Sequence, residues 1–212
     1  MYADRIEAGK KLAEKLMKYK NSDAIVVALP RGGVVVGYEI SRILNIPLDV
    51  LIVRKLGAPH NPEMGIGAIS TGNVLIIDED STKLLGIQQK DLEYIIEMES
   101  KELLRRCLLY RGDDKLPQVT GKTVILTDDG MATGVTVKAA ILALIKVNPQ
   151  KIILALPVCT TEAKAETEKI LRTNDELFCP EVSDRLTSIG EWYKNFDQVT
   201  DEMVVNYLKK EC

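Results

Sequence analysis

The sequence is poor in the residues that build most metal and nucleophile sites, because it contains one histidine, His60, and four cysteines. A single histidine excludes Ser-His-Asp triads and multi-histidine metal sites, unless carboxylates or thiolates supply every other ligand. The cysteines include no Cys-x-x-Cys pair, so their spacing indicates neither a zinc site nor a dense disulfide framework. We expect four buried free thiols: Cys107, Cys159, Cys179 and Cys212.

The chain also lacks an excess of positive charge and a long apolar run. Its 28 Lys and Arg stand against 31 Asp and Glu, a net charge of -3, so no general cationic field attracts nucleic acid. Apolar runs such as 24–29 and 152–156 are far shorter than the roughly 20 residues that span a bilayer. Residues 1–20 are amphipathic and charged, unlike a signal peptide. We therefore expect a cytoplasmic protein that binds neither nucleic acid nor a membrane.

Short apolar runs alternate with segments of helical periodicity along the chain. With 46% hydrophobic residues, 212 residues can bury one core, so we expect a single domain over 1–212. The pattern predicts a first helix within 1–20, with Met17 on its buried face. It then predicts strands at 24–29, 48–53, 123–127 and 151–156 and helices at 34–44, 88–111, 137–147 and 161–172. This alternation predicts an α/β fold with a mainly parallel sheet and helices on both faces.

Other segments depart from this alternation. Segments 66–70 and 73–77 flank Thr71-Gly72 and predict a β-hairpin. The prolines at 59 and 62 indicate a loop over 56–65. Aromatic residues gather near position 193, and we expect a small hood within 157–200. Thr200 is placed to cap a last helix around 203–208.

Chemistry-bearing residues concentrate in segment 124–136, VILTDDGMATGVT. Asp128 and Asp129 follow a predicted buried strand, where two carboxylates are costly unless they meet hydroxyl donors or a cation. The small and hydroxyl-bearing residues at 132–136 then enter a helix, whose first N–H groups can bind a phosphate. A diol beside a phosphate describes ribose 5-phosphate. A plain turn in which the two acids cap the helix explains the residue types about equally well.

The order and spacing of this segment resemble the signature of type I phosphoribosyltransferases, which binds phosphoribosyl pyrophosphate (PRPP). The resemblance implies that Asp128 and Asp129 hold the ribose hydroxyls. It also implies a loop that holds the 5-phosphate, made by Ala132, Thr133, Gly134, Val135 and Thr136. Gly130 and Val135 depart from the family pattern, which has an aliphatic and a smaller residue at these places.

A second segment, Pro30-Arg31-Gly32-Gly33, follows the first predicted strand. Glycines allow close approach of a ligand, and arginine adds a forked cation. An ordinary strand-to-helix turn is the alternative. By its position the segment resembles the pyrophosphate loop of the same family, in which a non-proline cis peptide often occurs. The resemblance thus implies that Arg31, Gly32 and Gly33 contact pyrophosphate, with a cis peptide at or beside Arg31.

The third segment joins two cations, Arg54 and Lys55, to the predicted loop 56–65. Surface decoration is the alternative for such residues. In the family a flexible loop in this place closes over PRPP, so Arg54 and Lys55 are expected to contact pyrophosphate; His60 receives no role. Further resemblance to a little-characterised branch of predicted phosphoribosyltransferases runs through most of the chain, at Arg5, Gly9, Leu12 and Ala13, 54–69, Cys179-Pro180 and Trp192-Tyr193.

The resemblance implies an enzyme that transfers a phosphoribosyl group from PRPP to a nitrogen acceptor, a nucleobase by expectation, and releases pyrophosphate. Magnesium would arrive with PRPP, and no resident metal site is expected. The residues assigned to catalysis are Arg31, Lys55, Asp128 and Asp129. Two alternatives stay open, a non-catalytic PRPP-sensing regulator and a hydrolase of a phosphorylated sugar. The sequence names neither the acceptor base nor the oligomeric state, so a homo-oligomer is left open.

Overall fold

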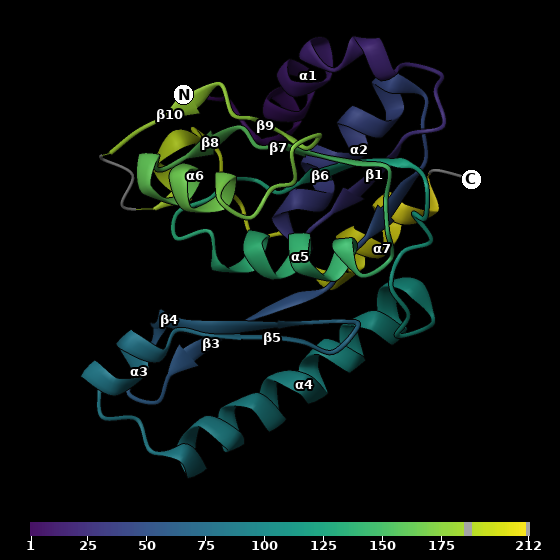
Figure 1. Ribbon diagram of the computed structural model, residues 1–212. Coiled ribbons are helices and arrows are strands. Elements are labelled where there is room, and N and C mark those ends of the chain that lie inside the picture. The colour runs from purple at the N-terminus through teal and green to yellow at the C-terminus, as the bar shows by residue number, and fades with distance from the viewer. Residues whose placement is uncertain (185–187, 211–212) are drawn as a thin grey trace.

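The computed structural model describes residues 1–184 and 188–210, so Cys212 and positions 185–187 of the expected hood lie outside it. A five-stranded sheet in the order β2-β1-β6-β7-β9 forms the centre, and every neighbouring pair is parallel (Figure 1). This confirms the predicted α/β fold. The strands are β1 (Ile25–Ala28), β2 (Leu48–Val50), β6 (Thr123–Thr127), β7 (Lys151–Ala155) and β9 (Glu176–Phe178).

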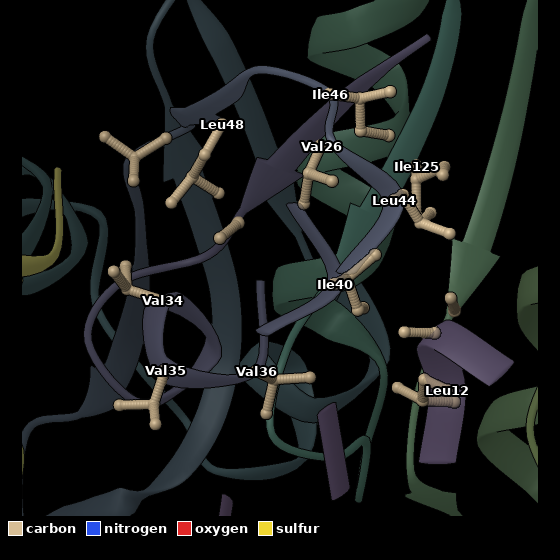
Figure 2. Close-up of a cluster of buried hydrophobic side chains, with 14 of the residues drawn as sticks. Leu12, Val26, Val34, Val35, Val36, Ile40, Leu44, Ile46, Leu48 and Ile125 are labelled. Atoms are coloured by element: carbon tan, nitrogen blue, oxygen red, sulfur yellow. The ribbon is translucent and has the colours of Figure 1, made fainter. Parts of the chain in front are cut away.

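Helices cover both faces of this sheet because successive strand residues point to opposite sides. Val26 and Ala28 belong to the cluster formed with the first group of helices, whereas Val27 belongs to the cluster on the other face. Figure 2 shows the first cluster, which includes Leu12, Val26 and Ile40. The first group is α1 (Arg5–Lys15), α2 (Gly32–Leu44) and α7 (Asp201–Lys209), and the second is α5 (Val135–Ile145) and α6 (Thr161–Glu168).

Helix α1 packs closely on α2 because Gly9 carries no side chain. A Cβ atom at Gly9 would lie 2.7 Å from the carbonyl oxygen of Val36. The expectation that Met17 faces the core is wrong, since 44% of this residue is exposed. Helix α1 ends at Lys15 and a short 3-10 helix, η1 (Met17–Tyr19), follows, so the helical periodicity that placed Met17 inward does not continue.

A second sheet stands apart from the central one (Figure 1). Its three antiparallel strands run in the order β3-β4-β5, and the pairing of β4 with β5 confirms the predicted hairpin around Thr71-Gly72. Helix α5 lies between the two sheets, and α4 lies on the outer side of the second (Figure 1). The elements are β3 (Val53–Ala58), β4 (Asn61–Ser70), β5 (Val74–Ile77), α3 (Glu79–Leu84) and α4 (Gln89–Arg111).

Two sequence predictions fail in this region. The predicted strand 48–53 is two strands, because β2 ends at Val50 and β3 begins at Val53 in the other sheet. The predicted loop 56–65 is wrong, because β3 and β4 occupy most of it. Residues 54 and 55 therefore do not follow a strand of the parallel sheet.

A β-bulge explains how β4 accommodates Pro62. Ala58 pairs with Asn61 and Gly57 pairs with Gly65, so Pro62 falls in the irregular part of the ladder, where a missing N–H costs little. Gly57 makes the room for it, since a Cβ there would lie 2.4 Å from the Pro62 carbonyl oxygen. Proline and glycine act here as bulge residues, although the sequence pattern indicated a loop.

The C-terminal third adds short elements beside the sheet edge. The strands β8 (Val158–Cys159) and β10 (Glu181–Val182) pair in parallel, and a 3-10 helix, η2 (Ile189–Trp192), follows. Helix α6 ends at Glu168, short of the predicted 172. Helix α7 begins as predicted, with the Thr200 hydroxyl accepting the Met203 N–H. None of the helices in the described part of the chain has the length and apolarity that a bilayer span requires.

The bulged pairing of β3 with β4 can be tested by hydrogen exchange. Amides of the ladder are expected to exchange much more slowly than those of 114–119, which form neither helix nor strand, because paired strand amides open only through unfolding. Mass-spectrometric exchange on the ligand-free protein measures both segments in one experiment. Equally fast exchange in the two segments would contradict the assignment of strands to 53–58 and 61–70.

Candidate active site

The two central strands end at a topological switch point. From β1 the chain passes through α2 to β2 on one side, and from β6 it passes through α5 to β7 on the other. The connections therefore leave the sheet in opposite directions and open a crevice at the carboxyl ends of the strands, the usual ligand site of such sheets. The turn 30–33 follows β1 and the acid pair follows β6, so the structure brings these two predicted segments together.

The acid pair is Asp128 and Asp129. The backbone N–H of Asp129 donates to Oδ1 of Asp128 at 2.8 Å. Oδ2 of Asp129 accepts from Nε of Arg5 at 2.8 Å, and only 15% of the Asp129 side chain is exposed. The preceding Thr127 is buried and donates its hydroxyl to the Ala155 carbonyl at 2.7 Å, which ties the end of β6 to β7. The carboxylates thus stand on a fixed strand end.

Burial raises the pKa of both carboxyl groups above their ordinary value, because a charge is poorly solvated there. For Asp128 the neighbouring charge of Asp129 raises the pKa further, and the N–H that it accepts only partly opposes this. For Asp129 the Arg5 guanidinium opposes the effect of burial. The pair is therefore short of donors in the ligand-free protein, as a site for a diol or a cation would be.

The turn after β1 touches the acid pair directly. The Pro30–Arg31 peptide bond is cis, which confirms the expectation of a cis peptide at Arg31. A Cβ at Gly32 would lie 1.9 Å from Oδ2 of Asp129, and a Cβ at Gly33 would lie 2.8 Å from the Asp128 Cα. Only glycine fits at both places, because any side chain would collide with the acids.

Arg31 extends from this turn toward the start of α7. Its Nη1 lies 3.7 Å from Oδ1 of Asp201, which is a long ion pair. The two side chains are 30% and 28% exposed. Two shorter bonds hold the Asp201 carboxylate, from the Tyr110 hydroxyl at 2.6 Å and from Nη2 of Arg105 at 2.8 Å. These donors lower the pKa of Asp201. No pattern in the sequence indicated this partner of Arg31.

The predicted phosphate loop lies at the start of α5. Gly134 caps the helix with φ of 74°, a left-handed conformation that favours glycine, and no side chain caps the first turn. The loop is held from outside, since the Thr160 hydroxyl donates to the Ala132 carbonyl at 2.8 Å. Free helix N–H groups at a positive dipole end suit an anion. Ala132 and Thr133 precede the cap, and Val135 and Thr136 form the first turn.

The structure separates the side chains of Arg54 and Lys55. Neighbouring residues of a strand face opposite sides. Nε of Arg54 donates to Oε2 of Glu99 on α4 at 2.7 Å, so Arg54 is not brought to the acid pair. The stem of Lys55 runs beside Gly65, whose Cβ position lies 3.9 Å from Val135 at the start of α5. Lys55 therefore lies on the side of the phosphate loop, and His60 is exposed in the turn between β3 and β4.

Three further residues reach the site without having been predicted there. Arg5 binds Asp129, Asp201 binds Arg31, and the Tyr193 hydroxyl donates to the Asp129 backbone oxygen at 2.6 Å. Arg5 had a sequence signal, because it stands four residues before Gly9 and so shares the apolar face of the first helix. In the structure it is 9% exposed. A cation on a buried face needs an acidic partner.

Comparison with known proteins identifies the family. The model of the phosphoribosyl transferase domain matches residues 2–193, and the chain belongs to this family. A Mycobacterium tuberculosis protein, named provisionally as a phosphoribosyl transferase, is 34% identical over 211 residues. This match covers 99% of the chain but 47% of the relative, so the chain spans about half the length of the curated relatives it matches.

Solved structures agree with the fold. The crystal structure of the protein TT1426 from Thermus thermophilus superposes with a TM-score of 0.78 at 34% identity, covering 99% of this chain and 98% of that one. A hypothetical protein from Neisseria gonorrhoeae, crystallised with bound ppGpp, has a TM-score of 0.52 at 15% identity and covers 99% of this chain and 94% of that one. The second likeness concerns the fold alone.

The raised pKa of Asp128 predicts that this residue destabilises the ligand-free protein at neutral pH. A carboxyl group whose folded-state pKa is raised binds more protons folded than unfolded, so stability falls as pH rises above its unfolded pKa. Asp128→Asn removes that cost and keeps an oxygen for the Asp129 N–H. We expect it to raise the free energy of unfolding at pH 7 by roughly 0.5–2 kcal/mol. Denaturant unfolding as a function of pH measures this.

Asp175 provides the matched control. Burial alone would raise its pKa, but the Arg172 side chain and the N–H groups of Ile152 and Arg172 lower it. A lowered pKa stabilises the fold above the unfolded pKa, and this stability is lost as pH falls through the folded value. Asp175→Asn should therefore destabilise the protein at pH 7. A loss of stability in both variants would contradict the contrast between the two acids.

Proposed function

We propose that this chain binds PRPP across the switch point and transfers its phosphoribosyl group to a nitrogen acceptor. The observation that carries the proposal is the contact between the turn 30–33 and the acid pair, where two glycines without room for a side chain meet two carboxylates that accept few hydrogen bonds. Membership of the phosphoribosyl transferase domain family supports it.

In this proposal the sugar and its phosphate lie along the segment after β6. Asp128 and Asp129 accept hydrogen bonds from the ribose hydroxyls, which add to the few donors that reach these partly buried carboxylates. The 5-phosphate lies at the uncapped N-terminus of α5, where Gly134 lets the backbone approach it. The two halves of ribose 5-phosphate thus match two neighbouring features of one segment.

The pyrophosphate would lie over the turn after β1. Arg31 can turn from Asp201 to a phosphate oxygen, because their contact of 3.7 Å is long and partly exposed. Lys55 approaches from the second sheet on the side of α5. Arg54, the other cation expected at the pyrophosphate, is bound to Glu99 at 2.7 Å in the ligand-free protein and would have to leave it to contact PRPP. Magnesium would enter with the pyrophosphate, whose oxygens are its preferred ligands.

In this reaction the protein mainly positions the substrates and stabilises the charge that develops during transfer. A nitrogen nucleophile, from a nucleobase by our proposal, displaces pyrophosphate at the ribose C1 carbon, and positive charge develops on the sugar. The acid pair fixes the sugar, and Arg31 and Lys55 stabilise the charge that leaves. No protein side chain need form a covalent bond. We assign the wall of the acceptor site to the segment 188–196, because its Tyr193 hydroxyl donates to the Asp129 backbone oxygen.

A direct assay tests this function. The protein is incubated with PRPP, magnesium and single nucleobases, and pyrophosphate release is followed. We expect release that depends on one base and is lost in Asp129→Asn. PRPP binding without release for any base would favour the regulator, and formation of ribose 5-phosphate without a base would favour a hydrolase.

The phosphate loop can be tested apart from catalysis. Gly134→Val forces a β-branched residue into a left-handed conformation where the phosphate would bind, so affinity for ribose 5-phosphate and for PRPP should both fall. Gly121→Val is the matched control, because Gly121 has φ of 72° and open space around it. Both variants should lose about 1–2 kcal/mol of stability, and only Gly134→Val should lose binding by calorimetry. If only PRPP binding suffers, the 5-phosphate lies elsewhere.

A further inference from the structure

Arg5 is a buried cation that the family signature does not explain. It is the first residue of α1 and is 9% exposed. Its Nε donates to Oδ2 of Asp129 at 2.8 Å, and its Nη1 donates to the Asp197 backbone oxygen at 2.9 Å. Its guanidinium carbon lies 3.7 Å from the centre of the Phe196 ring, a stacking distance. The guanidinium is therefore held by an acid, a backbone oxygen and an aromatic ring at once.

These contacts join three segments that are remote in the sequence. The Cβ position of Gly32 lies 2.9 Å from Nε of Arg5 and 1.9 Å from Oδ2 of Asp129, so the glycine turn closes one side of the ion pair. The segment 193–197 closes the other side, through the Phe196 ring and the Tyr193 hydroxyl on the Asp129 carbonyl. The ion pair is the point at which α1, the turn and this segment meet.

Arg5 supplies the positive charge beside the two carboxylates. The groups that face the two carboxyls are Arg5 from α1 and Tyr193 from the segment after η2, while the turn after β1 presents glycines. Within the described residues, Arg5 is the one cation bonded to either acid. Without it, two adjacent carboxylates would share one site, a situation in which one of them takes up a proton.

We propose that Arg5 is a positioning residue, which keeps Asp129 charged and in one orientation so that the acid pair can accept the ribose hydroxyls at neutral pH. This inference rests on the proposed function and adds to it a residue outside the signature. Arg5 does not touch the ligand, and its effect on ligand binding comes through Asp129. Its hydrogen bond to the Asp197 backbone oxygen and its stacking on Phe196 hold the guanidinium in place for that contact.

Two substitutions separate charge from shape. Arg5→Gln keeps a side chain that can donate hydrogen bonds but removes the charge, and Arg5→Lys keeps the charge but loses the fork and the flat stacking surface. Arg172→Gln is the matched control, because Nε of Arg172 binds the fully buried Asp175 at 2.9 Å near the amino end of β7. It should lose stability without any change in ligand affinity.

Calorimetric titration with ribose 5-phosphate and with magnesium PRPP, repeated from acidic to mildly alkaline pH, gives the decisive reading. For Arg5→Gln we expect affinity at neutral pH to fall roughly 10- to 100-fold, the range that corresponds to one charged hydrogen bond. The acidic limb of the pH profile should move to higher pH, and Arg5→Lys should restore part of both effects. An equal loss at every pH, with no shift of the limb, would mean a merely structural role and overturn the proposal.

A titration of the acid pair in the ligand-free protein tests the role of Arg5 independently of the proposed function. If the wild-type protein binds neither ligand, the proposed function fails, and the acids can still be titrated by carbon-13 NMR in the free protein. The acid pair should then titrate about one pH unit or more higher in Arg5→Gln than in the wild type. Should Arg5→Gln not fold, the same comparison is made with Arg5→Lys, for which a smaller rise is expected. Unchanged midpoints would overturn the proposal for Arg5.

Discussion

Two carboxylates placed side by side at the end of a buried strand set the conditions that the surrounding structure meets. Burial acts against the charge on both acids, and the neighbouring charge of Asp129 acts further against that of Asp128. Asp128 accepts the backbone N–H of Asp129, and Asp129 accepts from the Arg5 guanidinium. Gly32 and Gly33 pass close to the two acids because they carry no side chains. Because Arg5 and Tyr193 both bind Asp129, the first residue of α1 and the C-terminal third both reach the segment that follows β6.

The parts of this arrangement that depend on local pattern could be predicted from the sequence. The limits of β6 and the start of α7 follow from short apolar runs and a capping threonine. The meeting of the turn 30–33 with the acid pair also follows, because parallel strands present their carboxyl ends at one edge of the sheet. Residue spacing therefore located the centre of the candidate site, and sheet geometry supplied the contact between segments that lie remote from each other along the chain.

The parts that depend on pairing between remote residues could not be predicted. The bulge that admits Pro62 exists only in the register of β3 against β4, and without that register the prolines indicate a loop. The separation of Arg54 from Lys55 follows once they lie in a strand, because the chain then turns them to opposite faces. Arg5 and its acid are 124 positions apart, so a buried cation on a helical face signalled a partner without naming it.

A comparison of two acids within the same protein shows that the shortage of donors at the switch point is local. Asp175, near the amino end of β7, has a fully buried side chain and accepts four hydrogen bonds, two from the Arg172 side chain and one each from the N–H groups of Arg172 and Ile152. Its pKa is lowered, whereas that of Asp128 is raised. The chain can therefore satisfy a buried carboxylate completely where that acid serves the fold. At Asp128 the neighbouring turn presents Gly33, which carries no side chain to donate a hydrogen bond, so Asp128 keeps the raised pKa of an acid with few donors.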